Sequence, residues 1–161
     1  MPTSIYGALF SGTEPTRTQN YSVINVTGTT LTVTAATHSG TICTLNRATG
    51  IALTMPNATG TGNTYNFFIG TTITTTSVTT FTRGTAADVM SGICYMAKAA
   101  TALTPFLSAS NSNTITLGVS SNTSGGTLGD WLQFVDVGTN QWWVMLLLAG
   151  AGTVVTPFSN T

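Results

Sequence analysis

Hydrophobic and polar residues alternate along much of the chain with a period of two. Leu31, Val33 and Ala35 alternate with threonines, so one face of this segment is apolar and the other carries hydroxyl groups. The same alternation recurs at 51–55, 65–69 and 115–119. Glycine, asparagine or proline residues, which favour turns, bound these segments. The pattern predicts a series of half-buried β-strands.

Two segments near the C-terminus, 131–135 and 142–148, are apolar on both faces. Runs of this kind are typical of strands at the centre of a sheet. We therefore expect two central strands here, buried on both sides or packed against a partner subunit.

Helix signals are weak, and the best window is 85–102. Gly92 and the alternation over 93–96 favour a strand in this window, with a helix as the alternative. Short strands separated by glycine-containing turns are typical of sandwiches and barrels. The sequence therefore predicts an all-β fold, a single antiparallel β-sandwich or β-barrel-like domain over residues 21–161. Residues 1–20 show no sustained period and predict an extended N-terminal arm.

Charged residues make up only 5% of the 161 residues, against about 25% in average globular proteins, and the formal net charge is zero. The four basic residues are scattered, at Arg17, Arg47, Arg83 and Lys98. They form neither the basic patch that binds nucleic acid nor the polybasic run that holds a protein on an anionic membrane. We therefore expect no nucleic-acid or membrane partner.

The first residues lack the basic and apolar regions of a signal peptide. The longest apolar run, 142–152, is shorter than the roughly 20 residues that span a bilayer. We therefore expect the protein to stay in the compartment where it is made. Cys43 and Cys94 fall in strand-like segments, and we expect two reduced core thiols, with one disulfide as the alternative.

Candidate catalytic groups are few. His38, the only histidine, lies in a segment typical of an exposed turn, and no serine has a nucleophile-elbow pattern. Asp130 and Asp136 are six residues apart, which places both on one strand face, where turn capping or register fixing is expected rather than glycoside hydrolysis. Neither the Cys/His spacing nor the glycine-rich loops indicate a metal or nucleotide site. The sequence predicts a protein that is not an enzyme and has no cofactor.

Three tryptophans offer the strongest alternative chemistry. Trp131, Trp142 and Trp143 could form an aromatic platform for sugars. Trp142 and Trp143 are adjacent and point to opposite faces of a strand, so at most one of them would join such a platform. Core or interface packing is the favoured interpretation, and a carbohydrate-binding or adhesin module is the alternative.

The scarcity of charge also bears on assembly. Monomeric β proteins commonly protect their sheet edges with lysine, and this chain has only Lys98. Its edges must therefore be closed within a barrel, covered by the arm or paired with another subunit. We expect a homo-oligomer that works as part of a larger assembly.

Two stretches of the chain resemble structural proteins of tailed bacteriophages. The first is TICTLNRATGIALTMPNATGTG at 41–62, followed by YNFFIG at 65–70. The second is similar to the downstream half of the same proteins and comprises NTITL at 113–117, the glycines at 125–126, GDW at 129–131 and VDV at 135–137. The resemblance implies a virion component without catalytic residues. It would be made in the host cytoplasm and located on the capsid exterior.

Proteins of this kind include head decoration (cement) proteins, which sit as trimers on the outside of the major capsid protein and stabilise the capsid. Others are parts of the tail or fibre. By this resemblance, residues 1–20 would act as a clamp that becomes ordered on the capsid or on a neighbouring subunit. The residues expected at the contact surface are Ile5, Tyr6, Leu9, Phe10, Arg17, Trp131, Trp142 and Trp143.

Overall fold

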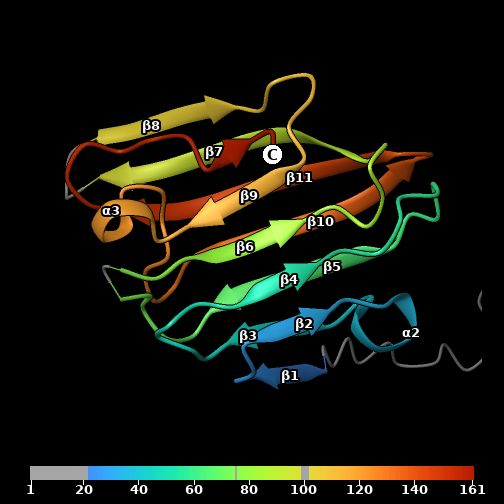
Figure 1. Cartoon of the computed structure of the whole chain (residues 1–161), viewed down its shortest axis with the longest axis horizontal. Coiled ribbons are helices and arrows are strands. Elements are labelled where there is room, and N and C mark those ends of the chain that lie inside the picture. Colours follow the sequence, from blue (N-terminus) through green and yellow to red (C-terminus); the bar gives the residue numbers. More distant parts are fainter. Residues whose placement is uncertain (1–21, 75, 99–101) are drawn as a thin grey trace, which may run out of the picture.

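Two β-sheets packed face to face make up the computed structural model, which describes residues 22–74, 76–98 and 102–161 (Figure 1). The larger sheet has seven strands, in the order β1 (Val23–Val26), β3 (Ile42–Leu45), β5 (Thr64–Ile69), β10 (Trp131–Gly138), β11 (Gln141–Gly150), β7 (Val89–Lys98) and β8 (Ala102–Leu107). The smaller sheet has five, in the order β12 (Phe158–Ser159), β9 (Thr114–Leu117), β6 (Thr79–Thr82), β4 (Ala52–Thr54) and β2 (Thr30–Thr32).

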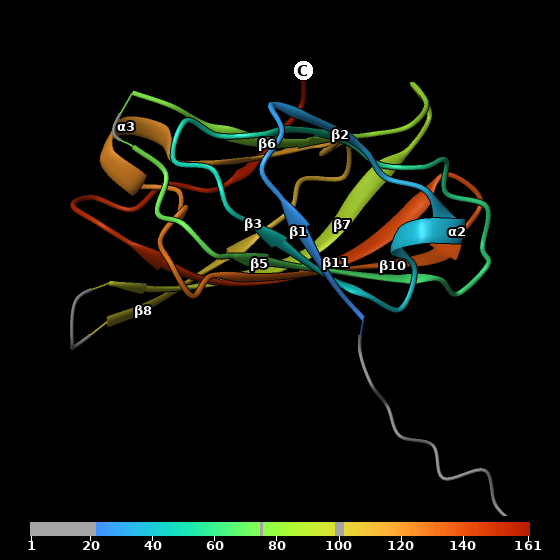
Figure 2. The ribbon, with the colours of Figure 1, turned by 90° about the horizontal axis from the view of Figure 1, so that it is seen from below.

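The described residues also form two short helices. They are α2 (Ala35–His38) and α3 (Val119–Asn122). Figure 2 shows the two sheets as layers, with α2 and α3 at opposite ends of the sandwich. The expected all-β sandwich is confirmed. The predicted arm, residues 1–20, lies outside the described residues, together with the expected contact residues within it.

The strand pairing differs from the expected antiparallel arrangement. From β1 to β6 the chain alternates between the sheets, so that β1, β3 and β5 pair in parallel in one sheet and β2, β4 and β6 pair in parallel in the other. Strands β7 and β11 are parallel as well. Five of the ten pairings are therefore parallel, and the prediction of an antiparallel sandwich was wrong. The reason is that each early connection crosses to the opposite sheet instead of forming a hairpin.

The two-residue rhythm locates most strands correctly. Segment 51–55 contains β4, segments 65–69 and 115–119 overlap β5 and β9, and the window 85–102 contains the strand β7, as favoured. The apolar segment 142–148 lies within β11, a central strand between β10 and β7, but only one of its two faces is in the core. The segment 30–35 forms a shorter strand than expected, because α2 begins at Ala35.

An aromatic cluster joins the two sheets. Phe81 on β6 of the smaller sheet packs against Phe67 and Phe134 of the larger sheet, with ring centroids 5.0 and 5.3 Å apart. Trp142 extends the cluster through Phe134 and through Tyr65, whose ring centroid is 5.6 Å away. All five side chains are almost completely buried. The hydrophobic core therefore lies between the sheets and leaves the outer face of each sheet free to take another role.

Candidate functional site

The outward-pointing side chains of the larger sheet are mostly apolar. Along β11, Trp142, Val144 and Leu146 point into the core, and the residues between them point outward. Strands β10, β7 and β8 contribute outward residues of the same kind. Together they form the outer apolar face, which consists of Ile93, Tyr95, Leu103, Leu107, Val135, Trp143, Met145 and Leu147.

The strand register arranges the outer apolar face in rows that run across the sheet. Met145 on β11 lies opposite Ile93 on β7, which lies opposite Leu107 on β8. In the next row, Leu147 lies opposite Tyr95. Such cross-strand neighbours are in contact on a sheet surface, so the rows form one continuous apolar patch.

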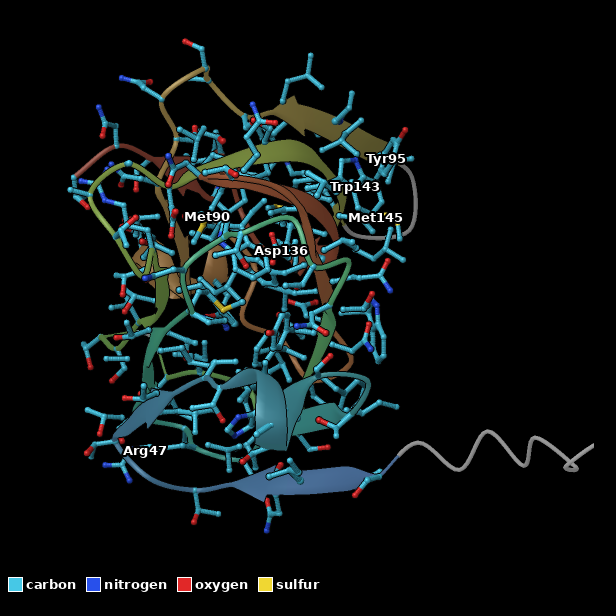
Figure 3. All side chains as sticks on the ribbon, turned by 90° about the vertical axis from the view of Figure 1, so that its right-hand side faces the viewer. Arg47, Met90, Tyr95, Asp136, Trp143 and Met145 are labelled. Atoms are coloured by element: carbon cyan, nitrogen blue, oxygen red, sulfur yellow. The ribbon has the colours of Figure 1, made fainter. Side chains whose placement is uncertain are left out.

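Several side chains of this patch are open to solvent. Leu107 is 74% exposed, Leu147 is 47% exposed and Trp143 is 40% exposed. Figure 3 shows Tyr95, Trp143 and Met145 gathered on one side of the molecule. Soluble monomers rarely expose a contiguous apolar patch beyond a few hundred Å², and larger ones mark interaction surfaces.

The outer face of the smaller sheet has a different composition. Strands β2, β4, β6 and β9 pair so that their outward residues form two rows rich in threonine. The rows are Thr30, Ala52, Thr80 and Thr116, and Thr32, Thr54, Thr82 and Thr114. We call this surface the threonine face. At the outward strand positions of the described residues, neither sheet carries a charged side chain.

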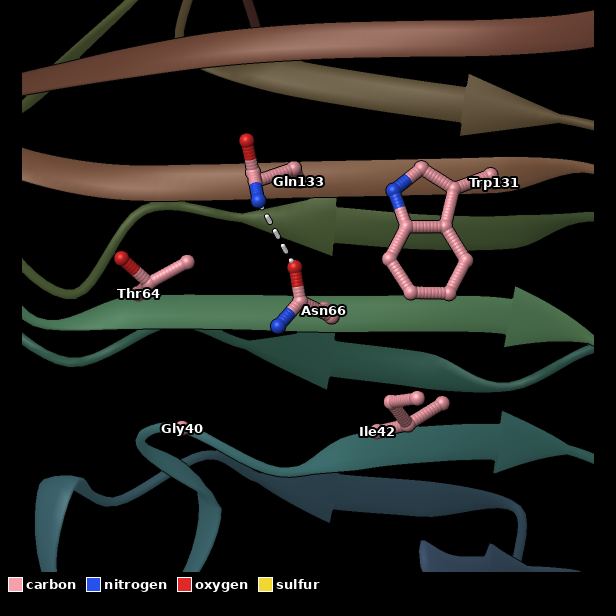
Figure 4. A pocket seen from close by; sticks show the side chains of 6 residues that line it. All are labelled: Gly40, Ile42, Thr64, Asn66, Trp131 and Gln133. Atoms are coloured by element: carbon pink, nitrogen blue, oxygen red, sulfur yellow. Dashed lines mark hydrogen bonds between the residues drawn. The ribbon is translucent and has the colours of Figure 1, made fainter. Parts of the chain in front are cut away.

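A groove of about 490 Å³ lies beside the outer apolar face, over β3, β5 and β10 (Figure 4). Its lining residues are Gly40, Ile42, Thr64, Asn66, Trp131 and Gln133. Strand pairing brings them together, because Asn66 on β5 lies opposite both Ile42 on β3 and Gln133 on β10.

Two amide side chains form the floor of this groove. The Nε2 atom of Gln133 donates a hydrogen bond to Oδ1 of Asn66 over 3.0 Å, and Nδ2 of Asn66 donates to the Thr41 carbonyl oxygen over 3.4 Å. Each amide retains a further donor or acceptor for a ligand. The partly exposed Trp131 ring lies next to them. In such an arrangement the aromatic ring can pack against the face of a sugar ring, and the amide groups can form hydrogen bonds with the sugar hydroxyls.

The three tryptophans have different positions. Trp131 and Trp143 are both on the outer side of the larger sheet, whereas Trp142 is 1% exposed and belongs to the core. As expected, the adjacent pair points to opposite faces. The prediction that Trp142 contributes to a contact surface was wrong, because the alternation along β11 turns this residue toward Phe134 and Tyr65.

Asp136 anchors the loop before β5. Its carboxylate accepts hydrogen bonds from the backbone N–H groups of Thr59, Gly60 and Thr61 over 2.9, 2.6 and 3.1 Å, and from the Thr61 hydroxyl over 2.7 Å. Burial alone would raise the pKa of Asp136, but these hydrogen bonds outweigh it and lower the pKa.

Asp130 has a similar role at the other end of β10. It accepts hydrogen bonds from the backbone N–H groups of Gly126, Thr127 and Ala149 over 2.7, 3.0 and 2.7 Å. Here burial outweighs the hydrogen bonds and raises the pKa of Asp130 to about 6. Both aspartates point inward and fix loops, which confirms the expectation of capping on one strand face.

His38 and the cysteines are buried. His38 lies in α2, and its Nδ1 atom accepts a hydrogen bond from the Thr34 backbone N–H over 3.0 Å, so the prediction of an exposed turn was wrong. Cys43 and Cys94 are free and buried, as expected. Burial raises the pKa of both thiols, that of Cys94 to about 12, so neither is a ready nucleophile.

Residues 22–74, 76–98 and 102–161 contain no group of three or more histidine, cysteine or acidic side chains placed to hold a metal ion. Within the same ranges, no helix has the length and apolar composition needed to cross a membrane.

Sequence reasoning missed the groove and part of the outer apolar face. Asn66 and Gln133 are 67 residues apart in the sequence and meet only through the pairing of β5 with β10. The residues of β8 were not predicted as a strand, so Leu103 and Leu107 were not assigned to a surface. The one available signal was that the segments 131–135 and 142–148, which lie in β10 and β11, are apolar on both faces.

Comparisons of the chain with protein-family models, curated proteins and solved structures found no match.

Proposed function

We propose that the protein is a non-enzymatic structural component of a tailed-phage virion that binds the outside of the capsid and stabilises it. One observation carries the proposal: neither outer face of the sandwich bears a charged residue at the described strand positions, and one of them is broadly apolar. An apolar sheet face of this size is stabilised when another protein covers it. The sequence resemblance to phage structural proteins favours a virion as the assembly to which the protein binds.

The threonine face adds a second kind of contact. Its hydroxyl groups can form short, neutral hydrogen bonds to a protein surface. Salt screens such bonds much less than it screens ion pairs between exposed charges. Contacts from the threonine face would therefore hold the protein on its partner across a wide range of ionic strength.

The proposal is tested by adding the purified protein to capsids assembled from the major capsid protein alone. We expect saturable binding, a higher temperature of capsid disruption, and retention of the bound protein from low to molar salt. Absence of binding, or steep release as salt rises, would contradict the proposal. The copy number in purified virions, measured by mass spectrometry, separates a capsid protein present in hundreds of copies from a tail or fibre component present in a handful.

A glycan-binding module is the second candidate, and the groove beside Trp131 favours it. The Trp131 ring and the amides of Asn66 and Gln133 provide an aromatic surface next to hydrogen-bonding groups. The test is glycan binding by the isolated protein. Trp131→Ala should abolish binding, whereas Trp143→Ala should not, because Trp143 lies outside the groove. Failure to bind any glycan would remove this candidate.

A further inference from the structure

Building on the proposed function, we infer that the outer apolar face is covered by a second copy of this chain, so that two copies pair face to face about a two-fold axis. The proposed function requires only that some protein covers this face. The structure favours the second copy through the distribution of apolar residues, the absence of charge and the area of the sheet.

Exposed apolar side chains are concentrated on one side of the molecule. Ten large hydrophobic residues are exposed in the described part of the chain, and seven of them lie on the outward side of the larger sheet. These are Val23, Tyr95, Leu103, Leu107, Val137, Trp143 and Leu147. The other three, Val78, Leu128 and Val155, lie in loops.

This distribution determines the symmetry. A head-to-tail contact, as in a ring of three, joins two different patches on each molecule, whereas a two-fold contact uses the same patch twice. The described residues provide one apolar patch and, on the opposite side of the sandwich, the hydroxyl-rich threonine face. The favourable contact joins the apolar patch of one copy to the apolar patch of the other. A two-fold axis produces this contact, whereas a head-to-tail contact would place the apolar patch against a different surface. We therefore infer a pair rather than the trimer expected from the resemblance.

The outer apolar face carries no charge that would oppose its pairing with a second copy. Like charges that meet across an interface oppose association. The rows of the outer apolar face, such as Leu107, Ile93 and Met145, contain no charged residue. Two identical copies can therefore meet without repulsion. The nearest described basic side chain on these strands, Lys98, stands at the end of β7 and points away from the rows.

The area of the larger sheet is close to that of a standard protein interface. At about 3.3 Å per residue and about 4.8 Å between strands, β10, β11, β7 and β8 present roughly 540 Å² and all seven strands roughly 760 Å². A stable interface of standard size buries about 800 Å² per partner. Sheets that stack face to face lie about 10 Å apart with interdigitating side chains, which suits a face built from large side chains. Standard interfaces range over about 600–1,000 Å² per partner, so the seven strands together reach this range, whereas the four strands that carry the outer apolar face fall just below it.

The experiment is sedimentation equilibrium of the full chain over a wide concentration range. We compare the wild type with Leu147→Lys, which places a charge near the middle of the patch, and with Val155→Lys, a control at a loop residue of similar exposure, 41% against 47%. We expect a dimer for the wild type and for Val155→Lys. We expect the Leu147→Lys dimer to dissociate at a concentration at least roughly 100-fold higher, because each pair would bury two unpaired charges.

Circular dichroism shows whether each variant keeps its fold. Should Leu147→Lys fail to fold, Leu107→Lys on the edge strand β8 replaces it, because this residue is 74% exposed and its loss leaves the core intact. The inference would be overturned if the wild type were a monomer or a trimer. It would also be overturned if all variants formed dimers of equal stability. Dimers that are weakened by the patch substitutions but never bind capsids would support the inference and contradict the proposed function.

Discussion

The buried carboxyl group of Asp130 gives the protein a specific dependence of stability on pH. Asp130 is 2% exposed, and burial raises its pKa from the ordinary 3.8 to about 6. An acid with a higher pKa in the folded state binds its proton more tightly when folded. Its contribution to stability is therefore full below about pH 4 and is lost as the pH rises through about 6.

The magnitude follows from the size of the shift. About two pH units at 1.36 kcal/mol per unit correspond to roughly 3 kcal/mol of unfolding free energy. Asp130→Asn removes the titrating group and keeps a side chain of the same shape. Between about pH 4 and pH 7, the wild type should lose roughly 3 kcal/mol relative to this variant.

The assay is urea unfolding of both proteins at a series of pH values, supported by carboxyl-carbon NMR titration of Asp130 in the native protein. Asp136→Asn is the matched control. Hydrogen bonds lower the pKa of Asp136, so its stabilising contribution is lost only as the pH falls below about 4, and the decline between pH 4 and pH 7 should remain in this variant. Parallel stability profiles for the wild type and Asp130→Asn, or an NMR midpoint near the ordinary pKa, would refute the reasoning.

Three further predictions concern the core, the thiols and the arm. Phe81→Ala should lower the unfolding free energy by about 3–5 kcal/mol in urea denaturation, because this ring fills the space between the sheets; a loss below about 1 kcal/mol would contradict the observed packing. Cys43 and Cys94 should react with a thiol reagent only after denaturation, and rapid labelling of the native protein would show that they are accessible. Deleting residues 1–20 should abolish capsid binding while circular dichroism stays that of a folded β protein, and unchanged occupancy would defeat the proposed clamp.

The alternation of apolar and polar residues predicted which side chains form the core, but it did not predict how the strands pair. Tyr65, Phe67 and Ile69 point inward as their spacing of two requires. Alternation is a property of one strand, whereas the parallel pairing of β3 with β5 depends on where the connections cross. For the same reason, the sequence could predict strands over much of the chain and an all-β sandwich without predicting its topology.

The candidate site could be predicted only in part, for related reasons. The opposite orientations of Trp142 and Trp143 follow from their adjacency, but which of the two faces solvent depends on which side of β11 the smaller sheet covers. The groove needs the pairing of β5 with β10, which joins Asn66 to Gln133 across a long stretch of sequence. His38 was misjudged because glycine and serine after it are typical of turns, whereas its burial depends on tertiary contacts.

The most direct test of assembly through uncharged sheet faces is an electron cryo-microscopy map of the native particle with this protein bound. We predict that protein density covers the side of the larger sheet that bears Trp143 and Leu147, so that this side does not face bulk solvent. A map in which that side of the sheet faces open solvent on every copy would contradict the account.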